Sequence, residues 1–352
     1  VERESAKAWY LPIRAITGDA TEFFFASKFR HGGELVGLYN WTVDGGTGRD
    51  DHLIAISREG DVIPWTGEDP ADAMTWTSTG VFFIGRIPKG RKIAAEYGGE
   101  LFMLSFFGLT TLSDLLRGGN PEDPFRDQIG YRIARLLRQD VTDYGDFQGW
   151  QLSFATAQGV LLVSCPQRTD DTYRQYVYNL STYGWGLWRA VPMLCNETVE
   201  GVLMFGTKTG SVMRMDVGAD NVSLLGDERT SIKFFVLTSY QSLGSPAQFK
   251  RIKLIRPTFV GTRAPEHRVY AYYDFLTLVQ PEITGVSDPV GDVWGSGLWD
   301  TALGSGGEVS PFASALGGSG IGRSVAVGLV GDAYEDAYLA SIDITWDVGG
   351  FL

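Results

Sequence analysis

Short apolar strands followed by glycine turns recur along this sequence. Three stretches share one form, in which four apolar residues lead through a small residue and a turn ending in glycine to a second strand: Leu53–Val62, Leu101–Thr110 and Val202–Val212. Their glycines, Gly60, Gly108 and Gly210, supply the positive φ that a hairpin turn needs. These glycines are 48 and 102 residues apart, and Gly159 fits the same spacing without the small residue. A period of about 50 residues with several strands per repeat predicts the blades of a β-propeller.

Length and composition set the scale of the fold. A chain of 352 residues is long enough for about two domains, and 44% hydrophobic against 20% charged residues excludes general disorder. We expect an all-β protein, with a β-propeller over residues 1–216 that is incomplete at its N-terminus. A β-sandwich-like domain with one wet face is expected over 217–352, carrying an extended Gly-rich loop over 285–322 anchored by Trp294 and Trp299.

The sequence shows neither a transmembrane segment nor a signal peptide. No run of 18 apolar residues is present, so we expect no transmembrane helix and no stable membrane insertion. The chain opens on Val1 and its first residues do not read as a signal peptide, from which we expect a start that is missing or processed.

Residues 121–140 break the strand pattern and predict a helix. Its apolar face consists of Phe125, Ile129, Ile133 and Leu136/Leu137. A second stripe consists of Arg132, Arg135 and Arg138. We expect Phe125, Ile129, Ile133 and Leu137 to be buried and the arginines to be mostly exposed or to face a partner. A helix packed on the propeller rim with solvated arginines and a helix that docks a partner both fit this pattern.

Charge is unevenly distributed along the chain. With 30 basic and 42 acidic side chains the net charge is −12, which argues against a broad basic face that grips nucleic acid. Residues 229–268 nevertheless carry eight basic side chains against one acidic, and residues 281–352 carry ten acidic against one basic. Either each segment is a solvated face, or the basic segment of one copy faces an acidic surface of the next. In the second case Lys250, Arg251 and Lys253 are the interaction residues, and replacing them with glutamate weakens assembly most at low salt.

Residues that could carry chemistry are few. We expect Cys165 and Cys195 to be free thiols on buried strands, and His31, His52 and His267 lie too far apart to predict a zinc site or a catalytic triad. The acidic turn Asp44–Asp51 predicts a long turn, with calcium binding as the lesser alternative. We expect no enzyme activity, no cofactor and no metal site.

Several segments together resemble the tail hub, or nozzle, proteins of short-tailed bacteriophages. The resemblance rests on Gly37–Asp51 leading into His52–Ser57, Trp65–Pro70, Gly99–Leu104, Gly108–Ser113, Tyr176–Leu180, Gly184–Trp188, Phe205–Val212, Phe249–Pro257, and Trp294 with Trp299–Asp300. They span almost the whole chain in the family's order, although each alone is a pattern of low specificity.

The resemblance implies a structural virion protein in the phage tail. It implies a β-propeller beside β-sandwich-like domains, a homohexameric ring, and a lumen that retains packaged double-stranded DNA and passes it at ejection without sequence-specific binding. Its further partners would be a tail adaptor or portal-side protein and tail fibre, spike or needle proteins. No catalytic residues are transferred. A glycan-binding or glycoside-cleaving β-propeller is one alternative and needs paired carboxylates in a pocket. A bacterial surface or cytoplasmic scaffold is another.

Overall fold

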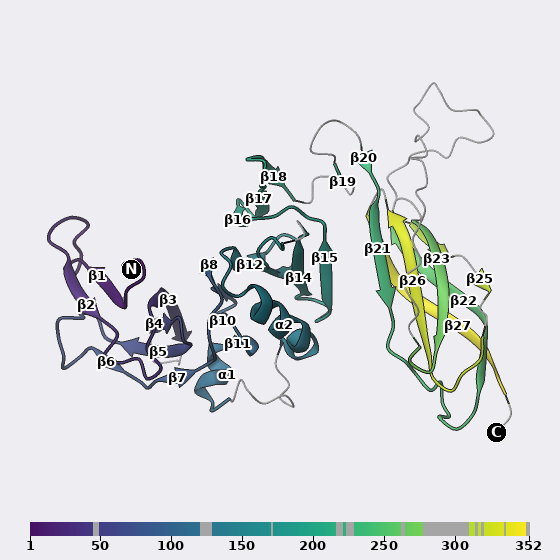
Figure 1. Ribbon diagram of the computed structural model, residues 1–352, viewed down its shortest axis with the longest axis horizontal. Helices are drawn as coiled ribbons and strands as arrows, with labels where there is room; N and C mark the ends of the chain where they lie inside the picture. Colours follow the sequence, from purple (N-terminus) through teal and green to yellow (C-terminus); the bar gives the residue numbers. More distant parts are fainter. Residues whose placement is uncertain are drawn as a thin grey trace. The chain divides into compact units, whose positions relative to one another are not determined.

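Strands dominate the regular structure of the computed structural model (Figure 1). The structure describes residues 1–44, 49–119, 129–169, 172–215, 221–222, 229–261, 265–276, 310–313, 316–317, 320–333 and 336–349. The chain divides into two units, Val1–Met215 and Asp216–Leu352, one residue before the boundary expected from the sequence. The prediction of an all-β chain is confirmed at this level.

The first unit consists of small antiparallel sheets that follow one another along the chain. An N-terminal hairpin of β1 (Lys7–Tyr10) and β2 (Thr21–Phe24) comes first. The β3–β7 sheet contains β3 (Leu35–Asp44), β4 (Arg49–Ser57), β5 (Asp61–Thr66), β6 (Thr77–Ser78) and β7 (Phe82–Phe83). The β9–β11 sheet contains β9 (Ala94–Tyr97), β10 (Glu100–Ser105) and β11 (Gly108–Thr111).

Two further sheets complete this unit. The β12–β15 sheet contains β12 (Trp150–Ala155), β13 (Val160–Ser164), β14 (Arg174–Asn179) and β15 (Trp185–Arg189), and β8 (Gly90–Lys92) joins it parallel to β12. The β16–β18 sheet contains β16 (Cys195–Val199), β17 (Val202–Gly206) and β18 (Val212–Arg214). Consecutive strands therefore pair in each sheet, except that β7 pairs with β5 and β8 pairs with β12.

The central strands of the β3–β7, β9–β11 and β12–β15 sheets are buried on both faces, whereas β17 is buried on one. On β10, Leu101 and Met103 join a cluster shared with β4, whereas Phe102 and Leu104 join a cluster shared with β12 and β13. The strand period of two sends alternate side chains to opposite faces. The β12–β15 sheet likewise shares its other face with the β16–β18 sheet. Strands that are apolar on both faces follow from this arrangement, because the β3–β7, β9–β11 and β12–β15 sheets each lie between two others.

The expected turn glycines all adopt the conformation that a hairpin requires. Gly60, Gly108, Gly159 and Gly210 have φ values of 99°, 120°, 64° and 85°. Gly60 also has no room for a side chain, since a Cβ there would lie 2.2 Å from the Gly85 carbonyl oxygen. The hairpins predicted from these glycines are confirmed: β4–β5, β10–β11, β12–β13 and β17–β18.

The predicted helix is present in its described part and ends four residues later than expected. The structure places a 3-10 turn, η1, at Tyr131–Ile133 and the helix α2 at Ala134–Tyr144, while residues 120–128, including Phe125, lie outside the described residues. Ile133 and Leu137 are buried as expected and Ile129 is partly buried. Leu136 is 49% exposed, which corrects its placement on the apolar face. A second helix, α1 (Leu112–Leu116), follows β11 and was not expected.

The second unit consists mainly of two antiparallel sheets. In one, β26 (Val325–Ala333) lies between β21 (Ile232–Leu237) and β23 (Glu266–Tyr273). In the other, β22 (Lys250–Gly261) pairs with β27 (Ala337–Val348) and with the short strands β24 (Ser310–Ala313) and β25 (Leu316–Gly317). A small hairpin of β19 (Asn221–Val222) and β20 (Arg229–Thr230) comes before β21. Ile252 and Ile255 of β22 share a hydrophobic cluster with Val325 and Val327 of β26, so the sheets pack face to face.

The Gly-rich segment, the two cysteines and the helices can each be compared with the sequence predictions. The Gly-rich segment 285–322 is not a loop throughout, because β24 and β25 of this segment pair with β22; Trp294 and Trp299 lie outside the described residues. Cys165 is buried, but Cys195 is exposed on β16, an outer strand of its sheet. No helix in the described part of the chain is long and apolar enough to cross a membrane.

Candidate assembly surface

Lys250 is buried inside the second unit and does not lie on its surface. Its side chain has no exposed area, and its Nζ donates hydrogen bonds to the carbonyl oxygens of Ser245 and, at 3.0 Å, Arg323. The backbone of Lys250 also pairs in both directions with Gly322, at 2.7 and 3.1 Å. The expected surface position is therefore wrong for this residue. A buried ammonium group is tolerated here because backbone carbonyls replace its water.

Basic side chains of β22 meet acidic side chains of β27 within one chain. Lys253 Nζ lies 2.6 Å from Asp347, and the Arg256 guanidinium lies 2.9 Å from Asp343. The antiparallel register of β22 and β27 creates these pairs, and all four side chains are about half exposed. Lys253 therefore has an acidic partner in its own chain, and Arg251 is exposed. Such exposed pairs contribute about 0.2–1 kcal/mol each. The expected pairing between copies stays a prediction.

The arginine stripe of the predicted helix divides into two kinds of residue. Arg132 and Arg135 are exposed as expected. Arg138 is partly buried, donates from Nε to the Phe107 carbonyl oxygen at 3.3 Å, and lies 5.6 Å from the centroid of the Phe107 ring. Arg132 and Arg135 thus stay available to a partner, whereas Arg138 fastens α2 to the turn between β10 and β11.

A buried charge network joins α2 to the β12–β15 sheet. Asp140 is 2% exposed, and its carboxylate accepts hydrogen bonds from Arg174 at 2.8 and 3.0 Å, from the Tyr176 hydroxyl at 2.6 Å, and from Arg168. Burial, and then the Asp140 carboxylate, raise the pKa values of the Tyr176 phenol and the Cys165 thiol. The Cys165 thiol therefore stays protonated and is a poor nucleophile. Sequence reasoning missed this network because its members are 28–36 residues apart.

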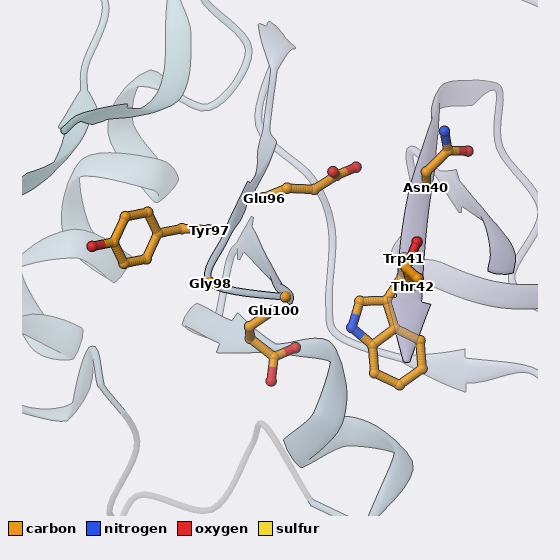
Figure 2. A pocket seen from close by; sticks show the side chains of 8 residues that line it. Asn40, Trp41, Thr42, Glu96, Tyr97, Gly98 and Glu100 are labelled. Carbon is orange, nitrogen blue, oxygen red and sulfur yellow. The ribbon is translucent and has the colours of Figure 1, made fainter. Parts of the chain in front are cut away.

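A cleft of about 270 Å³ lies between β3 and the β9–β10 turn (Figure 2). Its lining consists of Asn40, Trp41, Thr42, Glu96, Tyr97, Gly98, Gly99 and Glu100. Figure 2 shows the Tyr97 side chain directed away from Asn40 and Trp41, and its ring stacks on Phe154 with centroids 4.7 Å apart. The cleft is therefore bordered chiefly by β3 and by its two glutamates.

The two glutamates of the cleft have different roles. The Glu100 carboxylate accepts the backbone N–H groups of Leu101 at 3.0 Å and Ser113 at 3.1 Å, and also the Ser113 hydroxyl. Glu100 thus satisfies donors in the first turn of α1. A glycosidase requires two carboxylates that act on the substrate, one as acid and one as base or nucleophile. Glu100 is engaged in holding a helix, so this pair does not have that arrangement.

His31 and Asp61 form a pair that the sequence did not predict. The His31 ring Nδ1 lies 2.7 Å from Asp61 Oδ1, and the His31 backbone N–H donates to Oδ2 at 2.7 Å. The Ser57 hydroxyl oxygen accepts the Asp61 backbone N–H at 3.0 Å. In a catalytic triad the serine hydroxyl contacts the imidazole. Here it contacts the aspartate backbone, and the arrangement ties the β4–β5 turn to the N-terminal segment.

Side chains that could bind a metal ion are not clustered in the described part of the chain. Within the described ranges, no group of three or more His, Cys, Asp or Glu side chains is placed to hold an ion. Residues 45–48 of the Asp44–Asp51 turn lie outside those ranges, and the Asp51 carboxylate accepts the Thr42 hydroxyl at 2.7 Å. Calcium binding by that turn stays an open alternative.

Exposed apolar side chains gather on β21. Ile232, Phe235, Val236 and Leu237 are 45%, 36%, 36% and 38% exposed, and they lie on both faces of the strand. β21 is at the edge of its sheet. An exposed apolar edge strand is a ready site for pairing with another chain. This strand is the strongest assembly feature in the described part of the second unit.

Comparison with known proteins adds no family. No protein-family model matches the chain, and neither does any curated protein. Among solved structures, an insecticidal delta-endotoxin from Bacillus thuringiensis is similar at 9% identity with a TM-score of 0.16. That match covers 98% of this chain and 60% of the toxin, so the chain spans about three fifths of the toxin's length. A TM-score this low supports no conclusion about fold or function.

Proposed function

We propose that this chain is the repeating subunit of a ring-shaped channel in the tail of a short-tailed bacteriophage, a tail nozzle or hub. In this role the protein has no catalytic site. Copies of the chain surround a lumen that retains packaged double-stranded DNA and lets it pass at ejection. The ring is joined to a tail adaptor or portal-side protein on one side and carries fibre, spike or needle proteins.

The observation that carries the proposal is the series of small sheets, three of which, β3–β7, β9–β11 and β12–β15, bury both faces against their neighbours. Blades of a β-propeller are antiparallel meanders, and each packs its two faces on the blades before and after it. Strands β4, β10 and β13 each send alternate side chains into two different clusters, as a blade strand does. We infer that the β3–β7, β9–β11, β12–β15 and β16–β18 sheets are blades of a propeller, and that the two sheets of the second unit form a β-sandwich-like tube domain.

Charge supports the passage of DNA through such a ring. Duplex DNA carries one negative charge per roughly 1.7 Å of its axis, so a basic lumen would hold it by many phosphate contacts. A net charge of −12 per copy supplies a repelling wall if enough acidic side chains face inward. The duplex then stays centred and mobile.

A glycan-binding or glycoside-cleaving propeller is the less favoured alternative. Its substrate site would need two carboxylates facing one space, and the cleft at β3 holds Glu96 and Glu100. Because Glu100 holds the first turn of α1, the cleft supports this function poorly.

Electron microscopy of the purified full chain tests the proposal directly. We expect rings with an open central channel, and mass photometry should give a mass that is a multiple of 38.6 kDa, six copies being the expected number. A monomer at all concentrations, together with measurable cleavage or binding of polysaccharides, would overturn the proposal and favour the propeller enzyme or lectin.

A further inference from the structure

The sheet of β21, β26 and β23 has two open edges. β21 and β23 each pair with β26 and with no other strand in the described part of the chain. One edge, β21, exposes the apolar side chains Ile232, Phe235, Val236 and Leu237. On the other edge, Glu266 and Arg268 are exposed and Tyr270 is partly buried. The two edges therefore differ in character: one is apolar with a single lysine, and the other is charged and aromatic.

Strand direction favours a contact between unlike edges. β21 and β23 are both antiparallel to β26, so they run parallel to each other. A second copy related by rotation about an axis along the strands would present its β21 parallel to the β23 of the first copy. Repetition of such a head-to-tail contact closes into a ring.

The register places complementary side chains in the same rows of the sheet. On the face turned away from the hydrophobic cluster, Lys233, Asp332 and Glu266 form one row. Phe235, Val330 and Arg268 form the next row, and Leu237, Gly328 and Tyr270 form the third. Each row thus begins with a β21 residue and ends with a β23 residue.

We propose that the β21 edge of one copy pairs as a parallel strand with the β23 edge of the next copy, so that this sheet continues from subunit to subunit. This inference rests on the ring proposed above and names its contact. In register, the contact brings Lys233 beside Glu266, the Phe235 ring beside the Arg268 guanidinium, and Leu237 beside the Tyr270 ring. Opposite charges, a cation on an aromatic face and an apolar pair are each favourable across neighbouring strands.

The row of Lys233, Asp332 and Glu266 favours a head-to-tail contact over a two-fold contact. Within one copy this row holds two carboxylates and one ammonium group, and one oxygen of the buried Asp332 carboxylate accepts no hydrogen bond in the described part of the chain. The lysine of a neighbouring copy beside Glu266 places each lysine of the ring between two carboxylates, Asp332 of its own copy and Glu266 of the next. A two-fold contact between two antiparallel β21 strands, centred on Phe235, would set Lys233 against Leu237 and leave the lysine without an acidic neighbour.

A charge exchange tests the contact with a built-in control. Lys233→Glu and Glu266→Lys should each lower the apparent assembly constant at least tenfold at low salt, measured by mass photometry and sedimentation velocity. The double variant Lys233→Glu/Glu266→Lys should recover most of the loss, because the pair is restored with its signs exchanged. Lys253→Glu is the matched control: it reverses another exposed lysine, on the other sheet, and should leave assembly unchanged.

Disulfide trapping tests the register. In a Cys195→Ser background, Leu237→Cys/Tyr270→Cys should give a ladder of covalent oligomers under oxidising conditions, since paired strands bring Cα atoms within about 4.4–6.8 Å. The ladder should collapse with reductant. A covalent dimer from Phe235→Cys alone, with no ladder from the double variant, would show the two-fold contact and overturn the inference.

Hydrogen exchange of the unmodified protein covers the case in which a variant fails to fold. Backbone amides of β21 and β23 should gain protection on assembly, compared with dilute monomer. Rings without this protection, without the ladder and without recovery in the charge exchange would overturn the inference while leaving the proposed channel intact. Absence of any ring would instead contradict the proposed function.

Discussion

At the scale of single residues, Asp140 is the centre of a buried network of hydrogen bonds and ion pairs in the first unit. One carboxylate holds Arg168, Arg174 and Tyr176, which belong to the β12–β15 sheet and to the loop before β14. Two of these partners are cations that are less than a quarter exposed. Loss of the carboxylate would therefore leave partly buried charges without a partner, which costs far more than loss of a surface pair.

Asp140→Asn should destabilise the first unit by about 3–5 kcal/mol, because the amide keeps the shape but not the charge. Urea unfolding followed by tryptophan fluorescence measures the change. Asp146→Asn is the control, since Asp146 is 64% exposed and pairs with Arg86 at 3.0 Å; its loss should stay below about 1 kcal/mol. Similar losses for both variants would show that the network does not anchor α2.

The two cysteines should differ sharply in reactivity. Burial and the nearby Asp140 carboxylate raise the pKa of Cys165, so its thiolate is scarce at pH 8, whereas Cys195 is exposed. Titration with a chromogenic disulfide reagent should find one reactive thiol per native chain and two per chain in denaturant. Loss of the native signal in Cys195→Ser identifies the thiol. A fast second thiol in the native protein would contradict the packing around Cys165.

At the scale of elements, the hairpin turns can be compared because they share a sequence form and differ in surroundings. Gly60 lies against the backbone of Gly85, while no atom lies within 4 Å of a Cβ placed on Gly210. Both have positive φ. The conformational cost of a side chain is therefore similar at the two glycines, and the steric cost arises at Gly60 alone.

Gly60→Ala should destabilise the protein by more than about 3 kcal/mol, because an unfavourable φ is combined with a clash against backbone. Gly210→Ala should lose about 1–2 kcal/mol from the φ term alone. Thermal unfolding of both variants measures the difference. Equal effects would mean that the Gly85 segment moves aside freely, which would contradict close packing of the β4–β5 turn on its neighbour.

The elements also show where sequence patterns sufficed. Four hairpins could be predicted from turn glycines, because turn conformation depends on a few adjacent residues. The helical period also placed Leu137 among the buried residues, whereas the end of α2 at Tyr144 was not predicted. Lys250 and Lys253 show the same limit: both are basic residues of one strand, yet one is buried under backbone carbonyls and the other pairs with Asp347.

At the scale of the whole molecule, the proposed channel leads to a prediction about DNA. Isolated rings should retain little linear duplex at low salt, and retention should not rise as salt is lowered from 200 to 20 mM, because an acidic wall offers few phosphate contacts. Co-sedimentation of rings with labelled duplex measures this. Tight binding that weakens steeply with added salt would show a basic lumen and contradict the proposed channel wall.

The sequence alone determined the all-β class, the positions of the hairpins, the two-unit division and the opposite charges of the segments 229–268 and 281–352. Each depends on composition or on residues close together in the chain. Tertiary structure decided which charges meet. β22 and β27 bring the basic and acidic segments together across 87 residues, as in the pair of Arg256 with Asp343. Packing likewise brought Asp140 together with Arg168 and Arg174, and it left the apolar side chains of β21 exposed. Burial depends on which distant strand covers a face, and the local sequence does not contain that information.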